Sequence, residues 1–179
     1  GLLEGVRVLD LTHYFSGPYC TKLLATMGAD VLKIERPGAG DPVRRIGPFA
    51  VPITPTLQGE VKPEDGVRGE SGAWFLHLNT SKKSLTVDLK SGPGKEILLK
   101  LARTSDIVVE NFAPGTLDGL GLGYSELQRV NPALVMTSIS NYGQTGPYRD
   151  RKATEINLYA AGGLMSITGE PDREPLKEG

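Results

Sequence analysis

Residues that form covalent cross-links and metal sites are scarce in this sequence. Cysteine occurs once, as Cys20, which excludes an internal disulfide and a cysteine-based metal cluster. Histidine occurs only as His13 and His77, so we expect no protein metal site. Cys20 falls beside apolar residues on a predicted helix, a position typical of a small buried hydrophobic residue. For His13, a structural hydrogen-bonding role is favoured over a catalytic one.

Long apolar runs and a strong charge imbalance are also missing. No run approaches the roughly 18 apolar residues that span a bilayer, and the opening GLLEGVRVLD lacks the pattern of a signal peptide. The formal net charge of the 179 residues is −1, which gives no indication of a nucleic-acid or anionic-membrane partner. We therefore expect a cytoplasmic protein that binds neither nucleic acid nor membranes.

Three common sequence motifs are absent as well. No G-x-G-x-x-G follows the first predicted strand and no G-x-x-x-x-G-K-[ST] occurs, so the usual NAD and ATP signatures are missing. No G-x-S-x-G occurs either, which argues against a serine hydrolase of the usual α/β kind. Gly38-Ala39-Gly40 is only a fragment of a dinucleotide motif, so a nucleotide-containing ligand stays open as an alternative.

What the sequence does contain is an alternation of short apolar runs with helical spacing. The runs predict strands at residues 6–11, 29–35, 85–89, 106–110 and 133–140. The spacing predicts helices at residues 17–27, 95–103, 124–130 and 155–165. This alternation predicts an α/β fold with a mostly parallel sheet and flanking helices.

Glycine and proline gather in the loops after the predicted strands, at residues 12–18, 36–42, 111–115 and 141–147. In parallel sheets, ligands bind beyond the carboxyl ends of the strands, so we expect these loops to form the ligand site. Residues 37–72 hold six of the 13 prolines and seven of the 23 glycines, which predicts a long loop. The polar end GEPDREPLKEG lacks a closing strand, so the chain reads as though it were cut.

Several longer segments occur in an order and spacing that resemble a known family. They begin with VRVLDLTHYFSGPYCTKLLATMGADVLKIERPGAGDP and continue through LNTSKKSLTVDLK, VENFAPG and GQTGPY to LYAAGGLMSITGEPDREP. Together they cover nearly the whole chain and resemble the class III coenzyme A transferases (CaiB/BaiF type). That family includes formyl-CoA and carnitine CoA-transferases and the α-methylacyl-CoA racemases.

The resemblance implies a Rossmann-like large domain, of which residues 1–179 would be the N-terminal, CoA-binding part. A small domain and the C-terminal part would lie outside this chain, and an interlocked homodimer is expected of the full-length protein. The implied reaction moves CoA from an acyl-CoA to a carboxylic acid through covalent intermediates on an aspartate, which is expected after Gly179. Acyl-CoA and the acid are then substrates, and no tightly bound cofactor is expected.

Glu155, in the segment ATEINLYAAGGLM, matches an acidic position that lines the CoA site in members of the family. The resemblance thus implies a supporting role for Glu155, whereas the plain alternative is a solvated carboxylate favoured by the helix dipole. The family's racemases carry a histidine where this chain has Thr154, and threonine cannot act as a base near neutral pH. CoA transfer is therefore the leading hypothesis. An acyl-CoA racemase or isomerase and an inactive CoA-binding fragment are the alternatives.

The resemblance also implies a set of CoA contacts, carried over position by position. They are Phe15, Ser16, Arg36, Val87, Asp88, Leu89, Lys90, Asn111, Phe112 and Lys152. Arg36 suits a phosphate, with a plain surface role as the alternative. Val87, Leu89 and Phe112 are equally well explained by packing in a core. The family often has a polar residue in place of Phe15, so the contact there is expected to differ.

Overall fold

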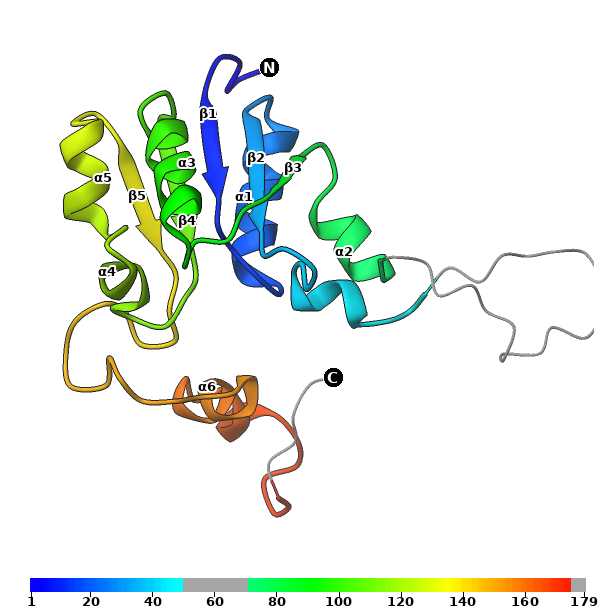
Figure 1. Ribbon diagram of the computed structural model, residues 1–179. Coiled ribbons are helices and arrows are strands. Elements are labelled where there is room, and N and C mark those ends of the chain that lie inside the picture. The colour runs from blue at the N-terminus through cyan, green and yellow to red at the C-terminus, as the bar shows by residue number, and fades with distance from the viewer. Residues whose placement is uncertain (50–70, 175–179) are drawn as a thin grey trace, which may run out of the picture. The chain divides into compact units, whose positions relative to one another are not determined.

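The computed structural model describes residues 1–49 and 71–174, and this part of the chain contains a five-stranded, all-parallel sheet (Figure 1). The strands are β1 Arg7–Asp10, β2 Asp30–Glu35, β3 Lys83–Thr86, β4 Ile107–Glu110 and β5 Val135–Ser138. Their order is β3-β2-β1-β4-β5, and every neighbouring pair is parallel. The predicted α/β fold with a parallel sheet and flanking helices is confirmed.

Short helices connect and follow the strands. The α-helices are α1 Ser16–Thr26, α2 Ala73–Leu78, α3 Gly92–Ala102, α4 Thr116–Leu120, α5 Tyr124–Val130 and α6 Glu155–Ala161, and the 3-10 helices are η1 Pro42–Arg45 and η3 Leu164–Ile167. The chain divides into two compact units, Gly1–Ile139 and Ser140–Gly179. The first unit contains the sheet with α1 to α5, and the second contains α6 and η3. Within the described residues, no helix has the length and apolarity needed to cross a bilayer.

Apolar side chains on the two faces of the sheet belong to two separate cores. Leu9 packs on one face with Leu98 of α3 and Leu127 of α5. Val8 packs on the opposite face with Ala25 of α1. Successive residues of a strand point to opposite faces, so β1 contributes to both cores. Burial on both sides explains why β1, β2 and β4 read as nearly continuous apolar runs.

The edge strand β3 differs from the strand predicted at 85–89. It begins at Lys83 and ends at Thr86, and all four of its residues are exposed. Val87 leaves the sheet and is buried in the core with an exposed fraction of 6%. The predicted bounds were wrong because apolar alternation marks the residues that enter the core, whereas the exposed edge strand has no such pattern. The strand therefore lies closer to the N-terminus than the prediction placed it.

The entry into α3 also lies earlier than the predicted helix at 95–103. Ser91 is the N-cap, and its Oγ accepts a hydrogen bond of 3.0 Å from the Gly94 amide. A Cβ at Gly94 would lie 1.9 Å from the Asp88 carbonyl oxygen, so this close approach requires glycine. The cap therefore holds the start of α3 tightly against the loop that leaves β3.

Other local predictions need correction too. The short helices α2 and α4 were not predicted, and the helix predicted at 155–165 ends at Ala161, before a separate 3-10 helix. Within the predicted loop 37–72, residues 42–45 form η1, while residues 50–70 lie outside the described residues.

A buried ion pair joins β1 to the turn that precedes β3. The Lys82 Nζ lies 2.9 Å from Asp10 Oδ2, and the exposed fractions of the two side chains are 1% and 0%. The same ammonium group also donates to Thr21 Oγ1, the Pro18 carbonyl and Asn79 Oδ1. Burial alone would raise the pKa of Asp10, but the nearby lysines and threonine hydroxyls outweigh it and lower that pKa.

Removal of the Asp10 carboxylate tests this pair. Asp10→Ala leaves the Lys82 ammonium buried without its counter-charge, so we expect the free energy of unfolding to fall by about 3 kcal/mol. Asp30→Ala is the matched control, because Asp30 pairs with Lys83 at 2.7 Å with side-chain exposed fractions of 48% and 71%. The control should cost below about 1 kcal/mol. Urea denaturation of both variants measures the difference, and equal losses would contradict this account.

Candidate functional site

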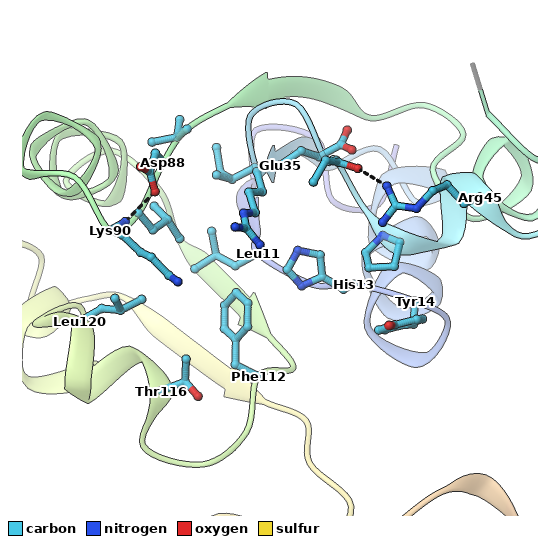
Figure 2. A pocket seen from close by; sticks show the side chains of 17 residues that line it. Leu11, His13, Tyr14, Glu35, Arg45, Asp88, Lys90, Phe112, Thr116 and Leu120 are labelled. Atoms are coloured by element: carbon cyan, nitrogen blue, oxygen red, sulfur yellow. Dashed lines mark hydrogen bonds between the residues drawn. The ribbon is translucent and has the colours of Figure 1, made fainter. Parts of the chain in front are cut away.

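A cavity of about 320 Å³ opens among the segments that leave the carboxyl ends of β1, β2, β3 and β4 (Figure 2). It is lined by Leu11, His13 and Tyr14 from the β1 side, Ile34, Glu35, Arg36, Ala39, Gly40, Pro42 and Arg45 from the β2 side, Val87, Asp88, Leu89 and Lys90 after β3, and Phe112, Thr116 and Leu120 after β4. The neighbours β1 and β4 are where the strand order reverses, which is the usual ligand position in such sheets.

One part of the cavity wall is apolar. Leu11, Ile34 and Val87 belong to the larger core cluster, and Leu89 and Phe112 pack against that cluster. Figure 2 places Phe112 and Leu120 on the β4 side of the cavity. Such a wall favours a flat, largely apolar group such as a nucleobase.

Three cationic side chains lie along the same cavity: Arg36, Arg45 and Lys90. Arg45 Nη1 donates to the Ala39 carbonyl at 2.9 Å. Within residues 1–49 and 71–174, the Arg36 guanidinium and the Lys90 ammonium have no hydrogen-bond or ion-pair partner. Two cations without a protein partner beside an apolar wall favour a ligand that carries phosphate.

The side chain of Glu35, at the end of β2, forms its hydrogen bonds with other groups of this chain. Glu35, 2% exposed, receives hydrogen bonds of 2.7 Å from both Arg44 Nε and Arg44 Nη2, and further bonds from the Asp41 amide and Ser84 Oγ. Burial alone would raise the pKa of Glu35, but these donors outweigh it and lower the pKa to about 2. The carboxylate next to Arg36 therefore stays ionised, and the positive charge of Arg44 weakens the repulsion that it would exert on an anion in the cavity.

A second buried ion pair supports the loops on the β1 and β2 sides. The Lys33 Nζ lies 2.9 Å from Asp41 Oδ2 and donates to the Thr12 carbonyl at 2.8 Å. Asp41 Oδ1 in turn accepts from the amides of Tyr14 and Val43. One lysine thus joins the loop after β1 to the turn that begins η1.

The loop after β1 is also joined to the loop after β4. The Asn111 side chain accepts from the His13 amide and donates to the His13 carbonyl, each at 2.8 Å. The His13 ring contacts the Phe112 ring edge-on, with centroids 5.3 Å apart. Burial lowers the pKa of His13, and this outweighs the opposite effect of Asp41 nearby.

Six of the predicted CoA contacts line the cavity together: Arg36, Val87, Asp88, Leu89, Lys90 and Phe112. Asn111 does not line it, because its amide holds the His13 backbone. Phe15 and Ser16 lie at the start of α1 outside the lining, and the Phe15 ring packs against Trp74 with centroids 5.6 Å apart. The CoA roles of all these residues stay predictions.

The two remaining predicted site residues, Lys152 and Glu155, belong to the second unit. Glu155 is the first residue of α6, where a carboxylate suits the helix dipole. Thr154 is the N-cap of that helix, and its amide and hydroxyl both donate to Asn157 Oδ1. The Thr154 hydroxyl therefore takes part in the hydrogen bonds at the N-terminus of α6.

Sequence reasoning missed Arg45 and Thr116 as lining residues and did not assign His13 to a ligand site. Arg45 is the last residue of η1, in a segment predicted as loop, and Thr116 begins α4, which was not predicted. The position of His13 in the loop that leaves the first predicted strand was the one available signal. No group of three or more His, Cys, Asp or Glu side chains that could hold a metal occurs among the described residues.

Comparison with known proteins agrees with the fold. The sequence profile of CoA-transferase family III matches residues 3–179. The chain belongs to this family. A CAIB/BAIF family protein from Brucella suis has a crystal structure that is similar with a TM-score of 0.84 and 39% identity, covering 99% of this chain and 43% of that one.

Two curated relatives of this chain are CoA-transferases by their names. Succinyl-CoA--D-citramalate CoA-transferase of Chloroflexus aurantiacus is 41% identical over 177 residues, which cover 99% of this chain and 40% of the relative. Formyl-CoA:oxalate CoA-transferase of Rhodopseudomonas palustris is 43% identical, with coverages of 99% and 37%. The chain thus spans about two-fifths of the length of these relatives.

The low pKa of Glu35 predicts a pH-dependent contribution to stability. Its folded-state pKa of about 2 lies below the ordinary 4.5, so the contribution is present above about pH 4.5 and is lost as the pH falls toward 2. Glu35→Gln should unfold at pH 7 with a free energy lower by roughly 3 kcal/mol, and this deficit should shrink as the pH falls. Urea denaturation at pH 7, 5, 4 and 3 measures it, with the exposed Glu96→Gln as control. A deficit that stays constant over this range would contradict the prediction.

Proposed function

We propose that the cavity binds the adenine nucleotide of CoA and that the full-length protein transfers CoA from an acyl-CoA to a carboxylic acid. The observation that carries the proposal is the combination of an apolar wall with two cations, Arg36 and Lys90, whose charged groups have no partner among the residues that the structure describes. The nucleotide end of CoA has the same two features, a flat base and several phosphate charges. The relatives act on acyl-CoA and acids by their names, which supports the same chemistry here.

In the proposed site, the apolar wall binds the base of the nucleotide and the cationic side chains bind its phosphates. The base lies against Val87, Leu89 and Phe112, where apolar contact favours it. Arg36 and Lys90 bind phosphate oxygens, with Arg36 offering the bidentate geometry of a guanidinium. Glu35 would repel a phosphate if its charge were free, so its pairing with Arg44 is part of the site.

The proposed reaction uses an aspartate that lies after Gly179 in the full-length protein. Its carboxylate oxygen attacks the thioester carbonyl, a bond from oxygen to the acyl carbon forms, and the carbon–sulfur bond breaks to release CoA as a thiolate. The thiolate next attacks the aspartyl carbonyl of this anhydride, which releases the donor acid and leaves an aspartyl-CoA thioester. The acceptor carboxylate attacks that thioester carbonyl and releases CoA thiolate, and the thiolate then attacks the acceptor's acyl carbon, which forms the new acyl-CoA and restores the aspartate. As the family resemblance implies, we assign a CoA contact to Lys152 and a supporting role to Glu155.

Racemisation is the weaker alternative. It needs a base that removes the α-proton of the acyl group, and the position before Glu155 holds Thr154. The Thr154 hydroxyl also donates to Asn157 Oδ1 at 2.8 Å in the N-cap of α6. CoA transfer is therefore the preferred reaction.

We also propose that the full-length protein forms a homodimer and is located in the cytoplasm.

The nucleotide site is tested by removing one phosphate contact. Arg36→Gln should raise the dissociation constant of CoA roughly tenfold or more, because a charge-assisted hydrogen bond is worth about 1.5–3 kcal/mol. Arg103→Gln is the matched control, since Arg103 is an exposed arginine at the far end of α3. Isothermal titration calorimetry with CoA measures both variants. Equal affinities of Arg36→Gln and the parent would contradict this site.

The reaction is tested with the full-length protein, a panel of acyl-CoA thioesters and a panel of carboxylic acids. We expect mass spectrometry to detect new acyl-CoA products only when both a thioester and an acid are present. Hydroxylamine should trap an acyl adduct on an aspartate after Gly179. Loss of α-deuterium from a 2-methylacyl-CoA, without any exchange of acids, would instead identify a racemase and overturn the proposal.

A further inference from the structure

His13 combines three features that the proposed nucleotide site does not yet use. Its ring lines the cavity and lies beside Phe112 in Figure 2. Its backbone is held on both sides by the Asn111 amide, so the ring position does not depend on the ring's own hydrogen bonds. Among the described residues, neither ring nitrogen has a hydrogen-bond partner.

The chain's own charges around this ring are largely balanced. Of the acids near it, Asp10 pairs with Lys82, Asp41 with Lys33, and Glu35 with Arg44. Four further charged groups line the same cavity: Arg36, Arg45, Asp88 and Lys90. Burial lowers the pKa of His13 most, and the environment favours the neutral ring. An imidazole that is neutral, partly buried and free of partners can gain a proton when an anion arrives.

We propose that His13 contacts a phosphate of the ligand in this cavity and takes up a proton from solvent when that ligand binds. The inference rests on the proposed nucleotide site, because it needs a phosphate in the cavity. The negative charge of a phosphate stabilises the imidazolium, whose two N–H groups are both donors. His13 thereby joins Arg36 and Lys90 as a third cation, but only in the complex and only at sufficiently low pH.

The consequence is a pH-dependent affinity with a definite sign. A ring that binds a proton more tightly in the complex makes the ligand bind more tightly as the pH falls. CoA itself carries a phosphate monoester that titrates near pH 6, so the pH dependence of affinity alone does not isolate His13. Direct observation of the ring separates the two.

The 179 residues contain two histidines, and in the full-length protein each is identified by the ring signal that disappears in His13→Gln or in His77→Gln. His77 lies on α2, outside the cavity lining, with its ring Nε2 3.1 Å from Lys22 Nζ. The NMR signals of the two rings are assigned with His77→Gln and followed from pH 5 to pH 8.5, with and without saturating CoA. We expect the titration midpoint of His13 to rise by about one pH unit or more with CoA. The His77 signals serve as the internal reference.

Variants give a second readout in the same buffers. Relative to the parent, His13→Gln should weaken CoA binding roughly threefold or more at pH 6 and leave it nearly unchanged at pH 8. His77→Gln should match the parent at both pH values. A His13 midpoint that stays the same with bound CoA overturns this inference and leaves the nucleotide site standing. A failure of the parent to bind CoA at any pH overturns both.

Discussion

Two buried lysines beneath the carboxyl edge of the sheet hold the segments on which the site depends. A buried ammonium group costs several kcal/mol unless it is paired and hydrogen-bonded, and each lysine here has an aspartate and further oxygen partners. Lys82 joins β1, α1 and the turn before β3 through Asp10 and its neighbours. Lys33 joins the loop after β1 to η1 through Asp41 and the Thr12 carbonyl. The loops that line the cavity continue from these segments, so the two ion pairs help to hold those loops in place.

The strand order gives the cavity its two kinds of wall. β1 and β4 are neighbours, and the loops that leave them are joined by the Asn111 amide and by the contact between the His13 and Phe112 rings. The cationic side chains of the cavity, Arg36 and Lys90, follow β2 and β3. The charge of Glu35 beside them is balanced by Arg44. A ligand with a flat apolar end and phosphates satisfies both walls at once. In the function that we propose, this sheet binds CoA and the reacting carboxylate lies after Gly179.

The central strands and the ligand edge could be predicted because they depend on local patterns. The apolar runs of β1, β2 and β4 follow from burial on both faces, and a parallel sheet puts the loops after them at one edge. The buried lysines could not be predicted, since Lys82 and its partner Asp10 lie 72 positions apart and nothing in a lysine's neighbours indicates burial. The short helix α2 was not predicted because it directly follows a segment rich in glycine and proline, which favours a loop. The positions of Arg36 and Lys90 at the cavity came from family resemblance, and that resemblance gave no indication that the Asn111 amide binds the His13 backbone.

The most direct test of the central claim is a crystal structure of the full-length protein with bound CoA. This account predicts the adenine base against Val87, Leu89 and Phe112, with phosphate oxygens within hydrogen-bond distance of Arg36 and Lys90. Electron density for the nucleotide at any other surface, with this cavity unused, would contradict it.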